Sequence, residues 1–149
     1  MKEIHKILVP VDFSDHSQLA LDEAIEFARA FGAEVHLLHS YHVLPQTVSP
    51  YGIVVPDTYE HDVRMAALQR LSEWRDRVSA AGCKVQEHIT ASFPSEAIVE
   101  LGERIGVDLI VMGTRGLTGF KHVLLGSVAE RTVRTARCPV LTVKCAVAH

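Results

Sequence analysis

The chain has 149 residues, of which 48% are hydrophobic and 22% charged, and its formal net charge is −3. This length predicts one domain over residues 1–149, large enough to bury roughly two thirds of the unfolded surface. The near-average composition excludes a disordered chain, and the slightly acidic balance argues against a nucleic-acid-binding surface.

The ends and the cysteines indicate a cytoplasmic protein. The apolar runs are far shorter than the roughly 20 residues that span a bilayer, so we expect no membrane insertion. The start, MKEIHKILVPVDF, lacks the apolar core and cleavage site of a signal peptide. Cys83, Cys138 and Cys145 are widely spaced without a CxxC pair, which favours reduced thiols over disulfides or a zinc site.

Short apolar runs alternate with helical patterns along the chain. The expected strands are residues 6–11, 34–41, 84–91, 109–113 and 140–144. The expected helices are 15–31, 57–81, one beginning at Pro94 that carries Ile98, Leu101 and Ile105, and 127–136. Asp15 and Gln18 resemble a capping box at the start of the first helix, and Gly82 is expected to stop the second.

This order predicts an α/β fold: a Rossmann-like open sheet of five mainly parallel strands with helices on both faces. The run 84–91 alternates polar and apolar residues, so we expect it at an edge. With strand order 3-2-1-4-5, the order reverses between the first and fourth strands. Ligands of open α/β sheets bind at such a reversal, beyond the carboxyl ends of the strands.

Four of the nine glycines gather at that place, in MGTRGLTGFKHVLLGSVAE over residues 112–130. Glycines Gly113 and Gly116 let backbone N–H groups face a ligand, while Gly126 and Ser127 offer N–H groups and a hydroxyl at a helix start. Such a site favours a phosphate, and Arg115 adds local positive charge. The alternative for Ser127 is purely structural, because residues 127–130 read as an S-x-x-E capping box.

Three further features carry weaker hypotheses. His36, His39 and His42 do not form a metal site, because on a strand His39 points away from the other two. Arginines 131, 134 and 137 form either a solvated helix face or a partner surface. Residues 42–56 contain three prolines and no period, and are either a surface insertion or a lid or partner contact.

The glycine run has the form G-x2-G-x9-G-[ST] over residues 113–127, and with KILVPVDFS and CPVLTVK near the two ends it closely resembles the universal stress protein family. The resemblance covers essentially the whole chain. It implies an ATP site in which the run holds phosphates and ribose, the loop after the first strand places an aspartate near ribose and metal, and the second strand ends at adenine. These roles fall to Gly113, Gly116, Gly126 and Ser127, to Pro10, Val11 and Asp12, and to Ser40, with Met112 and Val128 at neighbouring contacts.

Two details qualify this resemblance. Ser92 stands where the family commonly has a glycine, at the expected far edge of the sheet and away from the phosphate site. Asp12 is expected to hold a magnesium ion through water, and its alternative role is to cap the first helix.

No P-loop, GxGxxG or SGGxDS-type loop is present, and no nucleophile with its base can be assigned. We therefore expect a small ATP-binding regulatory protein rather than an enzyme, with at most very slow hydrolysis. A slow ATPase or nucleotidyl-transfer enzyme, and an interaction module without nucleotide, remain the alternatives. The apolar strand Val140, Leu141, Thr142 and Val143 is expected at a sheet edge, and it predicts a homodimer joined there, as the resemblance also implies.

Overall fold

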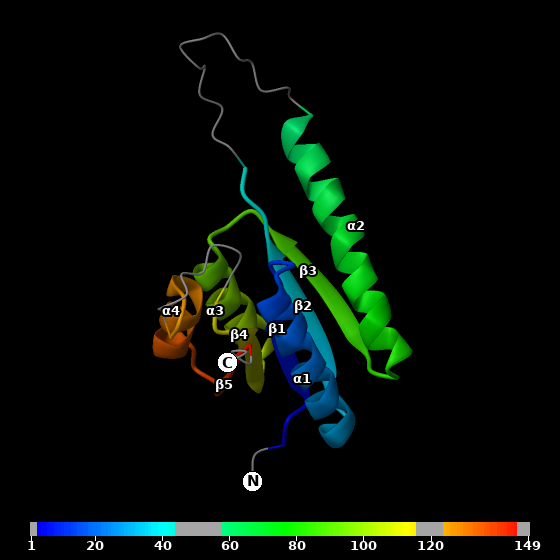
Figure 1. Cartoon of the computed structure of the whole chain (residues 1–149), viewed down its shortest axis with the longest axis vertical. Helices are drawn as coiled ribbons and strands as arrows, with labels where there is room; N and C mark the ends of the chain where they lie inside the picture. The colour runs from blue at the N-terminus through cyan, green and yellow to red at the C-terminus, as the bar shows by residue number, and fades with distance from the viewer. Residues whose placement is uncertain (1–2, 44–57, 116–123, 146–149) are drawn as a thin grey trace.

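The computed structural model describes residues 3–43, 58–115 and 124–145 of the chain. Five parallel strands form one sheet in the order β3-β2-β1-β4-β5 (Figure 1). The predicted α/β fold and strand order are therefore confirmed. The strands are β1 (Lys6–Pro10), β2 (Glu34–Ser40), β3 (Val85–Thr90), β4 (Leu109–Gly113) and β5 (Val140–Val143).

Helices cover both faces of the sheet, as the alternation of elements predicts. Helices α1 and α2 pack on one face, and α3 and α4 on the other. Their bounds are α1 (Asp15–Phe31), α2 (Tyr59–Ala80), α3 (Pro94–Ile105) and α4 (Ser127–Thr135), all close to the expected ranges. Among the described residues, none of these helices has the length and hydropathy needed to cross a membrane.

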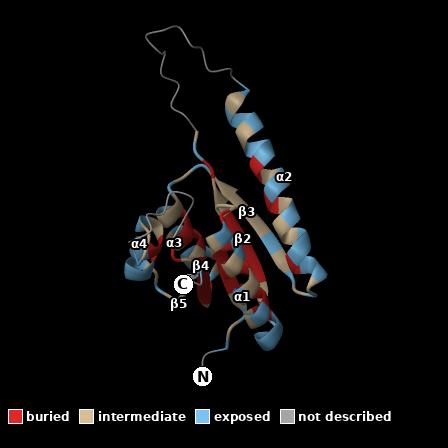
Figure 2. Cartoon of the chain, in the orientation of Figure 1, coloured by how far each residue is buried: buried red, intermediate tan, exposed pale blue. Residues whose placement is uncertain are grey.

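The central strands carry the core (Figure 2). Neighbouring residues of β1 point to opposite faces, so Ile7 and Val9 pack towards α1 and α2, while Leu8 packs towards α3. All three are completely buried. Fully burying such a side chain contributes about 1.5–3 kcal/mol, so this alternation ties both helix layers to one strand.

The first helix spans the expected residues 15–31, but its N-cap lies one residue earlier than the sequence suggests. Ser14 is its N-cap, and the Ser14 hydroxyl accepts a hydrogen bond from the backbone N–H of Ser17. The predicted capping box of Asp15 and Gln18 is therefore wrong, because Asp15 already lies inside the helix. The predicted stop after α2 is confirmed, since Gly82 follows the helix with a φ of 83° that favours glycine.

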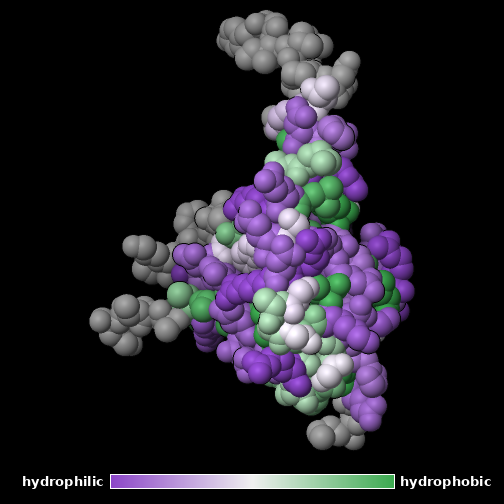
Figure 3. Space-filling view, turned by 90° about the vertical axis from the view of Figure 1, so that its right-hand side faces the viewer, coloured by the Kyte–Doolittle hydropathy of each residue, from purple (hydrophilic) through white to green (hydrophobic). Residues whose placement is uncertain are grey.

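Strands β3 and β5 form the two edges of the sheet, which confirms the edge position predicted for both. All four residues of β5 are only partly buried. Towards the other edge, α2 covers β2 and β3 and then extends past the sheet (Figure 1). The face turned to the viewer in Figure 3 is mainly hydrophilic, with separate hydrophobic patches.

Candidate functional site

A cavity of about 350 Å³ lies at the carboxyl ends of β1 and β4, where the strand order reverses. The connections that leave these two strands run to opposite faces, so a crevice remains between them. Its volume is within the range of about 300–1,000 Å³ that small-molecule sites have. The predicted site residues that line it are Pro10, Val11, Asp12, Ser40, Met112, Gly113, Arg115, Gly126, Ser127 and Val128.

Of the predicted residues, Gly116 alone lies outside the described part of the chain. Six further lining residues were missed by the sequence reasoning: Ser17, Leu38, Pro94, Ile98, Thr114 and Ala129. Most of them are apolar or belong to elements far from the glycine run. Their periodicity marks them as core, and only the packing of α3 and α4 beside the strand ends turns them into a cavity wall.

The N-terminus of α4 opens onto this cavity without a side-chain cap. Gly126 is the N-cap residue and Ser127 the first helical residue, so the predicted capping box of residues 127–130 is wrong. The first intrahelical bond is donated by the N–H of Glu130 to the Gly126 carbonyl. The N–H groups of residues 127–129 therefore have no partner within the helix, and together with the helix dipole they favour an anion.

The N–H of Gly126 does not take part in this set. It donates to the Thr114 carbonyl at 2.6 Å, and the N–H of Thr114 donates to the Val143 carbonyl at 3.1 Å. The prediction that Gly126 offers a free donor is therefore wrong. Its bond instead ties the start of α4 to the end of β4, which fixes the position of the helix N-terminus at the cavity.

Gly113 also has a structural reason to be glycine. A Cβ atom built on it would lie 2.8 Å from Cβ of His16 and 2.9 Å from the His16 backbone carbon and oxygen. The first turn of α1 therefore lies directly against the end of β4, closer than any side chain allows. The missing side chain serves helix packing, in addition to any approach of a ligand.

Asp12 holds the loop between β1 and α1. Its Oδ1 accepts hydrogen bonds from the backbone N–H of Ser14, at 3.0 Å, and from the Ser14 hydroxyl. Asp12 is thus not the N-cap of α1, but it orients the serine that is. Among the described residues, its Oδ2 has no hydrogen-bond donor, so one carboxylate oxygen remains available to a ligand or a hydrated cation.

The opposite wall of the cavity is apolar. Leu38 on β2, Ile98 on α3 and Met112 on β4 are almost completely buried and line it. Ser40 lies at the end of β2, and its hydroxyl donates to the Ser92 carbonyl beyond β3. One cavity thus combines an apolar wall with a positively polarised helix end, which suits an amphipathic anion such as a nucleotide.

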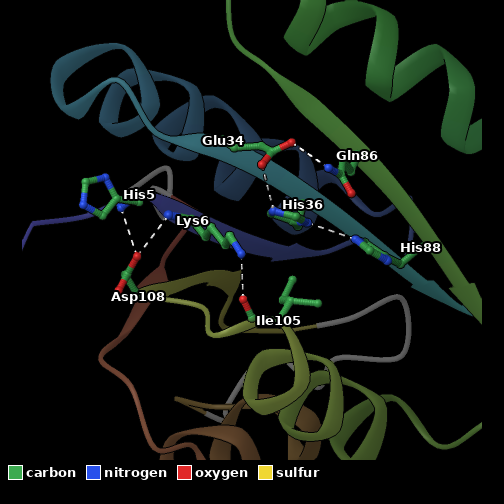
Figure 4. Close-up of polar contacts among 8 residues, drawn as sticks. All are labelled: His5, Lys6, Glu34, His36, Gln86, His88, Ile105 and Asp108. Carbon is green, nitrogen blue, oxygen red and sulfur yellow. Dashed lines mark hydrogen bonds and ion pairs between the residues drawn. The ribbon is translucent and has the colours of Figure 1, made fainter.

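The histidines divide between the two faces of the sheet, as predicted. His36 faces the α3 side, where its Nδ1 lies 3.0 Å from Nε2 of His88 (Figure 4). His39 faces the other side, and its Nδ1 lies 2.7 Å from the Val11 carbonyl. Burial is the main cause that lowers the pKa of all three. No group of three or more potential metal ligands occurs among the described residues.

Arg131 and Arg134 of α4 each lie near a carboxylate, and so does Arg137, which lies beyond the end of the helix and not in it as predicted. The pairs are Arg131 with Glu96 at 3.5 Å, Arg134 with Glu130 at 3.2 Å, and Arg137 with Glu103 at 3.0 Å. Exposed pairs of this kind contribute about 0–1 kcal/mol each. The local neutralisation favours the solvated-face interpretation over a basic partner surface.

Comparison with known proteins places this geometry in a family. A model of the universal stress protein family matches residues 3–144. MJ0577 of Methanocaldococcus jannaschii has a solved structure that is 31% identical, with a TM-score of 0.85 over 99% of this chain and 100% of that one. A universal stress protein in complex with cAMP is 28% identical, with a TM-score of 0.71 over 96% and 98% of the two chains. Another, from Archaeoglobus fulgidus in complex with dAMP, is 26% identical, with a TM-score of 0.67 over 95% and 98%.

Proposed function

Because the chain belongs to the universal stress protein family, we propose that its cavity binds ATP and that the protein acts as a nucleotide-dependent regulator. The observation that carries the proposal is the uncapped N-terminus of α4, which opens onto a cavity with an apolar wall. Two relatives with the same fold are solved with the adenine nucleotides cAMP and dAMP, which supports the ligand class.

Each part of the nucleotide has a matching part of the cavity. The adenine ring is assigned to the apolar wall near Leu38 and Ser40. The phosphates are assigned to the N–H groups at Ser127 and Val128, with Arg115 supplying positive charge at the same cavity. The ribose is assigned to the side of Asp12. When bound, a magnesium ion supplies positive charge to the phosphates, and the Oδ2 of Asp12 suits a water-mediated contact.

A regulatory role is favoured over a catalytic one by the groups in the cavity. Among the described lining residues, Asp12 and Arg115 are the titratable side chains. No serine or cysteine of this lining is paired with a histidine base, as covalent catalysis requires. Binding without rapid turnover lets the bound nucleotide alter the surface that a protein partner recognises.

Assembly is the second part of the proposal. The edge strand β5 pairs with β4 on one side, and its four residues are half-buried in the single chain. Antiparallel pairing of two β5 strands about a two-fold axis satisfies the edge N–H and C=O groups and prevents further growth. The proposed partner is therefore a second copy joined at Val140, Leu141, Thr142 and Val143.

Replacing Ser127 by proline tests the nucleotide site directly. Proline is favoured at the first position of a helix, and Gly126 already has the φ of −68° and ψ of 165° that suit a residue before proline. Helix α3 starts in this way, with Pro94 after an extended Phe93. The change removes one N–H donor to a charged group, worth about 1.5–3 kcal/mol, so ATP binding should weaken about 10- to 100-fold.

Isothermal titration calorimetry with ATP, dAMP and cAMP measures this loss. Ser127→Ala is the matched control, because it removes the hydroxyl and keeps the N–H. The Ser127→Pro variant should keep the wild-type melting temperature without nucleotide. Equal ATP affinity of the proline variant and the wild type would refute the assignment of phosphates to α4. Absence of ATP binding by the wild type, with no nucleotide in an acid extract of the purified protein, would refute the function itself.

A further inference from the structure

The loop between β1 and α1 contains an unusual backbone conformation. Phe13 has a φ of 64°, and among the described residues no other non-glycine residue has a positive φ. An aromatic residue in this region is a genuine outlier, because its Cβ crowds the neighbouring backbone. Such a conformation persists only where surrounding contacts hold it. Phe13 follows Asp12 directly and precedes the N-cap Ser14, so it lies beside the proposed nucleotide site.

Three side chains hold the Phe13 ring. Its centroid lies 4.5 Å from the ring of His39 on β2, and 5.6 Å from that of Trp74 on α2 in an edge-on arrangement. The guanidinium carbon of Arg70, also on α2, lies 4.2 Å from the Phe13 centroid. Aromatic pairs and a cation over a ring face are both favourable at these distances. The ring is thus clamped mainly by α2.

The clamp acts on the same segment that lines the cavity. Val11 and Asp12 line the cavity, and Val11 also belongs to the core cluster of α1 and α2 against which the Phe13 ring packs. His39 adds a second link, because its Nδ1 lies 2.7 Å from the Val11 carbonyl. The N–H of Val11 also donates to the Leu38 carbonyl at 2.8 Å. His39 and Phe13 therefore connect the cavity wall to α2.

We infer that Phe13 is a positioning residue: clamped by α2, it holds Val11 and Asp12 in the conformation that receives the nucleotide, an inference that rests on the proposed ATP site. A preorganised loop binds more tightly, because its ordering is complete before the ligand arrives. The coupling also runs in the other direction. Occupation of the cavity changes the environment of Trp74, the one tryptophan of the chain, so its fluorescence reports nucleotide binding.

The test compares ATP affinity and Trp74 emission among variants that do not contact the cavity. Phe13→Gly adopts a positive φ without strain and removes the ring, so it should weaken ATP binding at least about tenfold and abolish the fluorescence response. Phe13→Tyr keeps the ring and should bind ATP like the wild type. Arg70→Ala changes an exposed residue of α2 and should weaken binding about two- to fivefold.

A control separates positioning from loss of stability. Phe27 packs against the same core cluster as Phe13 and stacks with Phe31 on α1, but it does not line the cavity. Phe27→Ala should lower the melting temperature and leave ATP affinity unchanged. If Phe27→Ala weakens ATP binding as much as Phe13→Gly, the effect is one of stability and the inference is overturned.

The wild-type titration distinguishes the two levels of the proposal. Wild-type binding together with unchanged affinity in Phe13→Gly and Arg70→Ala would overturn the positioning role and leave the nucleotide site intact. Failure of the wild type to bind ATP would overturn the proposed function, and the positioning role with it. Graded loss, with Phe13→Gly weaker than Arg70→Ala and Phe13→Tyr unaffected, supports the inference.

Discussion

Replacing Gly113 by alanine should destabilise the protein even in the absence of nucleotide. The added Cβ atom would lie 2.8–2.9 Å from three atoms of His16, two of which belong to the backbone of α1. Backbone atoms cannot turn aside as a flexible side chain can, so the first turn of α1 has to shift away from β4. This shift strains the packing of α1 against the sheet.

The size of the effect follows from the cost of overpacking a tight interior, which is about 1–3 kcal/mol. In a chain of this length, each kcal/mol corresponds to about 2–4 °C, so the melting temperature of Gly113→Ala should fall by roughly 2–12 °C. Thermal unfolding followed by circular dichroism measures the fall. Urea unfolding should show a lower midpoint with an unchanged slope.

Gly102→Ala is a control that should raise the melting temperature instead of lowering it. A Cβ atom on Gly102 would meet Cδ2 of Leu8 at 3.9 Å, an ordinary contact, in the interior of α3. Alanine is favoured over glycine there by about 0.5–1 kcal/mol, so Gly102→Ala should raise the melting temperature by roughly 1–4 °C. An unchanged melting temperature for Gly113→Ala would refute the packing argument, and so would an equal fall for both variants.

Three other expectations concern pH, assembly and turnover. Burial lowers the pKa of His36 and His88 from the ordinary value of 6.5. Below pH 6.5 the unfolded chain therefore binds more protons than the folded protein does. The free energy of unfolding should fall as the pH drops from about 6.5 towards the lowered pKa values. Urea unfolding at several pH values measures this fall, and the His88→Leu variant should show a smaller one. An equal dependence of the free energy of unfolding on pH in the variant and the wild type would contradict the explanation. Light scattering at micromolar concentration should give twice the 16.4 kDa mass of one chain, and a wild-type monomer would exclude the β5 dimer. The carbonyls of Pro139 and Val143 accept bonds from β4, so by alternation the N–H of Thr142 points to the free edge. Thr142→Pro should therefore give the monomer with its helix content retained. Phosphate release from ATP should be far slower than about one per second, the lower end of ordinary enzyme turnover, and several per second would show that the protein is an enzyme.

The order of elements, the fold class and the place of the cavity could be predicted from the sequence, because the patterns behind them are local. A strand such as Leu109–Gly113 shows itself by a continuous apolar run, and α1 by the spacing of its apolar residues. Parallel strands joined by helices allow few topologies, so the reversal between β1 and β4 could be expected, with the glycine run beside it.

The contacts that the site residues make with neighbouring segments were decided by the tertiary structure. The sequence offers Ser127 as a cap, yet Gly126, whose N–H bonds the Thr114 carbonyl, is the N-cap, and Ser127 is the first residue of the helix, at the cavity. Gly113 reads as a ligand contact, yet it is also the place where α1 meets β4. Both outcomes depend on distances between segments that are remote in the chain.

The same reason explains the Phe13 clamp and the histidine pair. Phe13 meets Trp74 only because α1 and α2 cover one face of the sheet, and His36 meets His88 only because β2 and β3 pair in a particular register. Periodicity tells which face a side chain takes, because successive residues of a strand alternate. It does not tell which side chain of another element lies opposite, because register and helix placement are settled when the whole core packs.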